Sequence, residues 1–107
     1  MMNDISREEL KTRLDRGEPL KLVMVMPDWA YCAKHIPGSF ACIAPEEAFA
    51  LLEPDDEIIV YCSDPACMNS YHAYEVLEQH GYRHLRHYAG GLVDWEAAGY
   101  PLEGESV

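Results

Sequence analysis

The feature that most constrains the fold of this chain is the run Ile58-Ile59-Val60-Tyr61, which is apolar at every position. A strand with one face in water alternates apolar and polar residues, whereas a strand covered on both faces is apolar throughout. The run follows the turn residues Glu53-Pro54-Asp55-Asp56. It therefore predicts a buried central strand with other elements packed on both of its faces.

The rest of the chain alternates between strand and helix patterns. Ser6 and Glu9 have the spacing of a capping box, which predicts a helix that Gly17 ends. We expect further strands at 20–26, 40–43 and 84–88, and further helices at 45–52, from about 69 to 80, and after residues 90–91. Strands that alternate with helices over short connections imply parallel pairing. The predicted fold class is therefore α/β, a small open parallel β-sheet flanked by helices on both faces.

Composition and charge narrow the class of protein. The 107 residues are 49% hydrophobic, which suits one soluble domain with a buried core. Eight basic residues against 19 acidic ones give a net charge of −11, which argues against nucleic acid and anionic membrane surfaces as partners. No apolar run approaches the roughly 20 residues that span a bilayer. The first five residues lack the features of a signal peptide, so we expect a cytoplasmic location with reduced thiols.

The segment most informative about chemistry begins at Cys62, directly after the buried strand, and a helix is predicted to begin near Ser70. In open α/β sheets, sites form in the loops that leave the carboxyl ends of strands. A loop bent back there points its N–H groups at one atom, and the helix N-terminus adds about half a positive charge. Both would stabilise a Cys62 thiolate and make it a nucleophile. The alternative is a buried cysteine that only packs against the sheet.

Three sets of residues resemble known motifs. The first is His35-Ile36-Pro37-Gly38-Ser39, and the second is Tyr61-Cys62 followed by a loop and a helix start. The third is the closing series Gly81-Tyr82, Gly90-Gly91, Trp95 and Gly99-Tyr100-Pro101. In this order and at these separations they resemble the rhodanese family of sulfurtransferases, from about residue 5 to residue 102. The resemblance implies that residues 1–107 form a single rhodanese-like domain.

The resemblance also implies an activity and a site. Cys62 would be the catalytic residue: it would take sulfane sulfur from a donor, thiosulfate or a persulfide, and hold it as a persulfide for a thiophilic acceptor. The implied active-site loop comprises Ser63, Asp64, Pro65, Ala66, Cys67, Met68, Asn69 and Ser70. The expected partners are a small sulfur donor and a thiol acceptor or a protein persulfide carrier. We expect no cofactor, no metal, no nucleic acid and no membrane.

The loop departs from the family pattern in length and in charge. It is longer than the usual loop, contains Asp64, and has Asn69 where the family often has an arginine. The dianion thiosulfate would meet only backbone dipoles here, so we expect weak thiosulfate turnover and a better fit to a neutral or protein-bound persulfide. Met24 and Met26 stand where the family usually has an Asp–Arg pair, a change that we expect to affect stability more than catalysis.

The other cysteines and the histidines leave alternatives open. Cys67 is a resolving thiol that forms a disulfide with Cys62, a sulfur acceptor, or an inward-packed loop residue. The chain is accordingly a sulfurtransferase, a thiol–disulfide switch or a catalytically silent binding module.

Cys42 is expected in the core, and Cys32 in the loop before His35. Four cysteines and five histidines invite a metal site, but Cys-x4-Cys has no paired second half here. His72, in the first turn of the helix predicted after the loop, is a further candidate for reaching the loop.

Overall fold

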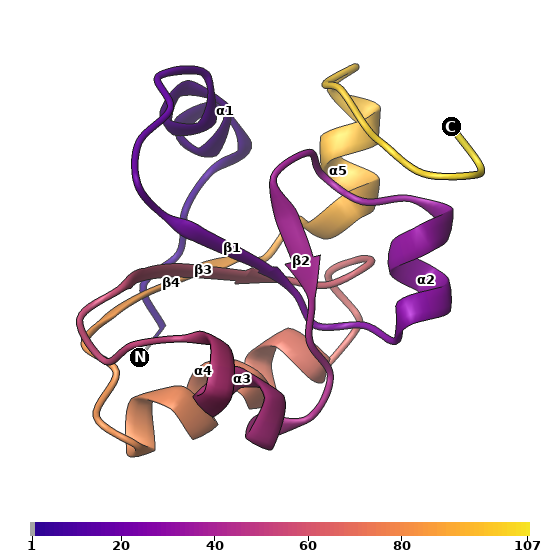
Figure 1. Ribbon diagram of the computed structural model, residues 1–107. Coiled ribbons are helices and arrows are strands. Elements are labelled where there is room, and N and C mark those ends of the chain that lie inside the picture. The colour runs from indigo at the N-terminus through magenta and orange to yellow at the C-terminus, as the bar shows by residue number, and fades with distance from the viewer. Residues whose placement is uncertain (1) are drawn as a thin grey trace.

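The computed structural model describes residues 2–107, which contain a four-stranded parallel sheet with strand order β2-β1-β3-β4 (Figure 1). The strands are β1 (Lys21–Met24), β2 (Ser39–Ala41), β3 (Glu57–Tyr61) and β4 (His84–Tyr88). The helices are α1 (Arg7–Asp15), α2 (Asp28–Ala33), α3 (Pro45–Leu51), α4 (Asn69–Gln79) and α5 (Gly91–Ala97). The predicted α/β fold with an open parallel sheet is confirmed.

Strand β3 lies in the centre of the sheet, between β1 and β4. Residues 58–61 are 0% exposed, as the uniformly apolar run predicts. Ile58 and Val60 belong to the apolar cluster under α3 and α4, whereas Ile59 and Tyr61 belong to the cluster under α1 and α5. Figure 1 shows these two pairs of helices on opposite faces of the sheet. The sheet is therefore covered on both faces.

Helix α1 begins and ends as its sequence predicts. The hydroxyl of Ser6 accepts a hydrogen bond from the Glu9 amide at 3.1 Å. Ile5 and Leu10 are buried in the same cluster, which fixes the direction in which the chain enters the helix. Gly17 follows the helix with φ +67°. Local sequence is sufficient for this element because its cap, its apolar contact and its terminating glycine are all close in the chain.

Helix α2 was not predicted, and the expected position of Cys32 in a loop is wrong: Cys32 lies in α2 and is exposed. The helix has six residues and no side-chain cap. Its second half is held from elsewhere, because the Tyr31 hydroxyl donates to the Ser39 carbonyl at 2.7 Å and the Glu105 amide donates to the Cys32 carbonyl at 2.8 Å. Such long-range ties leave no pattern in the local sequence.

The first two strands are shorter than expected. Strand β1 ends at Met24 rather than at residue 26, and β2 covers 39–41 rather than 40–43. The pairing still extends slightly beyond β1, because the Val25 amide donates to the Tyr61 carbonyl at 2.8 Å. Residues 25 and 26 are therefore held beside the carboxyl end of β3, next to the loop that carries Cys62.

The two adjacent glycines before α5 have different roles. Gly90 has φ −62°, and a Cβ there would lie 2.6 Å from Asp94 Oδ2. Gly91 has φ +71°, and a Cβ there would lie 2.8 Å from the Cys62 carbonyl oxygen. The Leu92 amide donates to that same oxygen at 3.0 Å. Gly91 therefore lets α5 approach the start of the Cys62 loop.

A buried polar pair joins the beginning of α4 to β4. Ser70 Oγ and His87 Nε2 lie 2.8 Å apart, and both residues are buried. His87 Nδ1 has no hydrogen-bond partner among the described residues, and the nearest carboxylate oxygen, Asp4 Oδ1, is 3.9 Å away. Burial lowers the pKa of His87, and the charge of Asp4 opposes that shift in part. The Ser70–His87 pair holds helix α4 against β4 while the His87 imidazole is neutral.

The lowered pKa of His87 predicts a pH-dependent stability. Its pKa in the unfolded chain is near 6.5 and lies lower in the folded chain, so the unfolded chain binds more protons between those two values. The contribution of His87 to the free energy of unfolding is therefore fully present above pH 6.5. It decreases as the pH falls below 6.5, by at most about 1.4 kcal/mol per pH unit. Urea unfolding at a series of pH values should show a shallower decline for His87→Gln. Asp4→Asn should steepen the decline, and profiles that match in all three proteins would contradict the assignment.

The close approach at Gly91 predicts unequal effects of alanine at two glycines of similar conformation. Gly99 has φ +75° with nothing near its Cβ position, whereas Gly91 faces the backbone of Cys62 and Asp64. Both substitutions should cost about 1 kcal/mol of unfolding free energy from backbone strain. Gly91→Ala should cost about 1–3 kcal/mol more because backbone atoms must move. Equal losses in urea unfolding would show that the contact is not tight.

Candidate active-site loop

Cys62 is the first residue after β3, and its surroundings fix where the loop begins. The residue is 1% exposed. Its carbonyl accepts from the Leu92 amide, and the next carbonyl, of Ser63, accepts from the Val93 amide at 3.0 Å. Both donors belong to the first turn of α5, where N–H groups have no partner within the helix. The start of the loop is therefore attached to the N-terminus of α5.

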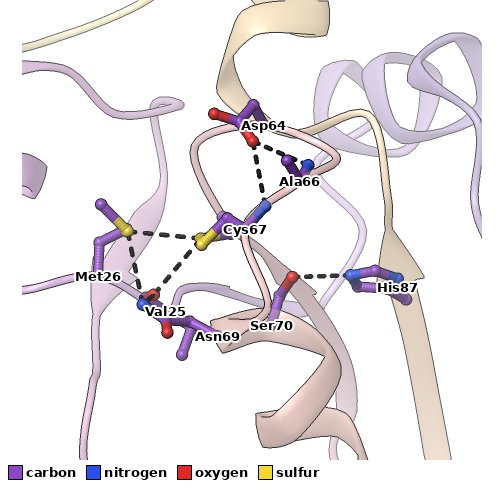
Figure 2. The surroundings of a disulfide bond; sticks show 9 residues. Val25, Met26, Asp64, Ala66, Cys67, Asn69, Ser70 and His87 are labelled. Atoms are coloured by element: carbon purple, nitrogen blue, oxygen red, sulfur yellow. Dashed lines mark hydrogen bonds between the residues drawn. A yellow bond between two sulfur atoms is a disulfide. The ribbon is translucent and has the colours of Figure 1, made fainter.

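The loop is closed by a disulfide between Cys62 and Cys67 (Figure 2). Their Cα atoms are 6.3 Å apart, within the range of about 4.4–6.8 Å that disulfides require. Cys67 is half-buried, unlike Cys62. In this state Cys62 has no thiol and cannot act as a nucleophile until the bond is reduced.

Asp64 organises the turn between the two cysteines. Its Oδ1 accepts hydrogen bonds from the Ala66 amide at 2.8 Å and the Cys67 amide at 3.1 Å, as Figure 2 shows. The loop amides were predicted to point at the Cys62 sulfur. In the disulfide form these two amides donate to Asp64 instead. A carboxylate, rather than the cysteine sulfur, therefore receives their positive dipoles.

Electron-rich atoms lie beside Cys62 Sγ. Met26 Sδ is 3.4 Å away and the Val25 carbonyl oxygen is 3.8 Å away. Because the disulfide sulfur carries no proton, these are packing contacts and not hydrogen bonds. Asn69 Nδ2 donates to the same Val25 carbonyl at 3.3 Å. Met24 and Met26 were expected to affect stability more than catalysis, but Met26 touches the candidate catalytic sulfur. Parallel pairing of β1 with β3 was the signal that could have placed it there.

The remaining candidates lie around this centre. Ser70 contacts His87 and not the sulfur, while Pro65, Ala66, Met68 and His72 are exposed. Within residues 62–70 there is no lysine or arginine. The loop therefore carries no lysine or arginine charge of its own.

His35 lies away from the loop, as a member of the turn before β2. Its Nδ1 lies 2.8 Å from the Tyr31 carbonyl oxygen, and its ring stacks on that of Tyr31 with centroids 3.8 Å apart. Its Nε2 lies 3.3 Å from a Glu103 carboxylate oxygen. These contacts fasten α2 and the C-terminal segment, so the role of this histidine is structural.

Cys42 is buried, as expected, and lines an apolar cavity of about 130 Å³ between the sheet, α3 and α4. Burial raises the pKa of its thiol to about 11, so Cys42 is protonated near neutral pH and is a poor nucleophile.

Across residues 2–107, no three metal-ligating side chains gather into a cluster. In the same part of the chain, every helix is too short or too polar to cross a membrane.

Comparison with known proteins places this geometry in a family. The sequence model of the rhodanese-like domain matches residues 6–98. A rhodanese-like domain from Anabaena sp. is 29% identical with a TM-score of 0.87, over 99% of this chain and 82% of that one. A Bacillus halodurans protein is 26% identical with a TM-score of 0.88, over 97% and 78% of the two chains.

A third solved structure shares the fold alone. The thiosulfate sulfurtransferase of Pseudomonas aeruginosa is 21% identical with a TM-score of 0.81, and the match covers 96% of this chain and 20% of that one. Among curated proteins, no sequence is significantly similar to this chain. The family match covers most of the chain, including the loop and both elements that hold it, so the chain belongs to the rhodanese-like domain family.

Proposed function

We propose that this chain is a sulfurtransferase that carries sulfane sulfur as a persulfide on Cys62. The observation that supports this most directly is the place of Cys62 in a rhodanese-like fold, at the carboxyl end of the central strand and at the head of a loop that leads to α4. Helix α4 has eleven residues, so its N-terminal dipole favours negative charge in the loop before it. That dipole lowers the pKa of a thiol placed there.

The reaction begins with the reduced loop. The Cys62 thiolate attacks the outer sulfur of the donor, a bond forms between the two sulfurs, and the donor's own S–S bond breaks. With thiosulfate the electron pair leaves on sulfite; with a persulfide it leaves on a thiolate. An acceptor thiolate then attacks the outer sulfur of the Cys62 persulfide, and Cys62 leaves as a thiolate. Each step exchanges one S–S bond for another, so no external oxidant is needed.

The charges of the loop favour some donors over others. Asp64 places a carboxylate between the cysteines, no basic side chain lies in residues 62–70, and the chain carries a net charge of −11. Dianionic thiosulfate meets repulsion here, which is weaker for a neutral persulfide and for a protein-bound one. We therefore propose a small persulfide or a protein persulfide carrier as donor, with a thiol as acceptor.

A thiol–disulfide switch is the second candidate function, and the Cys62–Cys67 disulfide is the observation that favours it. In the cytoplasm, the location that we propose, disulfides are uncommon and are mostly transient or catalytic. Intact mass separates the candidates. Gain of one sulfur atom by the reduced protein supports sulfur transfer, and loss of two hydrogens on mild oxidation without sulfur uptake supports the switch. No change under either treatment supports a binding module.

The proposed function predicts which cysteine accepts sulfur. Reduced Cys62→Ser should gain no sulfur from a persulfide donor, because a hydroxyl cannot form a persulfide, whereas Cys42→Ser should gain one sulfur atom as the wild type does. Cys42 is the matched control, since its thiol is buried and its pKa is raised to about 11. Intact mass under anaerobic conditions measures both. Sulfur uptake by Cys62→Ser on another residue would contradict the assignment.

The absence of a basic side chain from the loop leads to a prediction about thiosulfate. Asn69 is exposed at the first position of α4, beside the loop. Asn69→Arg should raise kcat/KM for thiosulfate several-fold, because one opposite charge near the water-exposed site contributes on the order of 1 kcal/mol. Asn69→Gln, which also removes the short amide but adds no charge, should show no gain. An unchanged rate in folded Asn69→Arg would show that charge does not limit thiosulfate use.

A further inference from the structure

The two cysteines of the disulfide differ in exposure. Cys62 is 1% exposed, and its sulfur is in contact with Met26 Sδ at 3.4 Å and the Val25 carbonyl oxygen at 3.8 Å. Cys67 is half-buried and lies between exposed residues, Ala66 before it and Met68 after it. Thiol–disulfide exchange begins with a nucleophile reaching one of the two sulfurs. Access therefore directs an incoming nucleophile to Cys67.

Attack at Cys67 displaces Cys62 Sγ, which becomes a thiolate at the carboxyl end of β3, in the loop before helix α4. The dipole of α4 favours negative charge in this loop and acts on either cysteine, so it does not distinguish the two sulfurs as leaving groups. The direction of cleavage therefore rests on accessibility.

The loop also restricts the nucleophile. Asp64 holds a carboxylate against the Cys67 amide, and no basic side chain lies in residues 62–70 to attract a large anion. Small size and a single negative charge reduce both the steric and the electrostatic cost of approach. Hydrosulfide, HS⁻, has both properties and is a strong sulfur nucleophile. Its attack on a disulfide gives a persulfide directly.

We propose that the disulfide form of this chain consumes hydrosulfide and generates a persulfide on Cys67. Hydrosulfide forms a new S–S bond to Cys67 Sγ, the Cys62–Cys67 bond breaks, and its electron pair stays on Cys62 as a thiolate. The hydrosulfide sulfur is oxidised and the Cys62 sulfur is reduced, so the disulfide itself is the oxidant. A thiol acceptor then takes the outer sulfur and leaves both cysteines reduced.

This reaction is distinct from the function proposed above. It starts from the oxidised loop, needs no sulfane-sulfur donor, and places the persulfide on a different cysteine. The redox state of the loop therefore separates the two in the wild type: the reduced protein should gain sulfur on Cys62 from a persulfide donor and none from hydrosulfide, whereas the oxidised protein should gain sulfur on Cys67 from hydrosulfide. Failure of one reaction leaves the other measurable in the same protein.

The test uses the full chain with Cys32→Ser and Cys42→Ser, so that Cys62–Cys67 is the disulfide that reacts. The oxidised protein is mixed with sodium sulfide without oxygen, quenched with an alkylating reagent at successive times, and cleaved on the N-terminal side of Asp64. That cleavage separates Cys62 from Cys67 into different peptides. Extrapolated to zero time, the extra sulfur should be about tenfold more abundant on the Cys67 peptide than on the Cys62 peptide.

A second variant tests the shielding. Met26→Ala removes the thioether that covers Cys62 Sγ, and it should shift part of the initial label to the Cys62 peptide. Met68→Ala is its matched control, because Met68 belongs to the same loop but is exposed, and the initial label of this variant should stay on the Cys67 peptide. No sulfur uptake by the oxidised protein, initial label chiefly on Cys62, or an unchanged distribution in Met26→Ala would each overturn the proposal.

Discussion

The burial of β3 between two layers of helices is the constraint on which the site depends. Residues 58–61 contact α3 and α4 on one face and α1 and α5 on the other, so any slip in register would expose apolar side chains or bury polar ones. The Tyr61 hydroxyl adds a specific tie, because it accepts from the Ile36 amide at 3.1 Å and lies 2.9 Å from Ser39 Oγ. Burial raises the pKa of Tyr61 to about 12, which keeps that hydroxyl neutral. Cys62 therefore leaves the core at a fixed position.

The loop after Cys62 is held by three kinds of contact, and together they decide which atoms can react. Amides of α5 bind the carbonyls of Cys62 and Ser63, Asp64 binds two loop amides, and the disulfide joins the ends. Met26 and Val25 cover the Cys62 sulfur, the atom that we propose to carry sulfane sulfur. The oxidised loop consequently presents Cys67 to solvent and protects Cys62, whereas reduction is required before Cys62 can attack a donor.

Several site features could not be predicted because they arise from segments far apart in the chain. Met26 contacts Cys62 across 36 positions, through the parallel pairing of β1 and β3. The pair of Ser70 and His87 depends on how α4 lies on β4. Gly90 and Gly91 are adjacent and identical in type, yet of the two only Gly91 has positive φ and would place a Cβ against the backbone of Cys62 and Asp64. Local patterns hold no information about such approaches.

The sequence by itself determined the order of the main elements, the both-sided burial of β3, the cap of α1 and the position of Cys62 at the end of a strand. These follow from periodicity, capping residues and motif spacing, which act over a few neighbouring residues. The tertiary structure decided that α2 exists, that Asp64 takes the amides of Ala66 and Cys67, and that Met26 covers the Cys62 sulfur. Those outcomes depend on how the loop closes and on which strands lie side by side, and packing of the whole chain settles both.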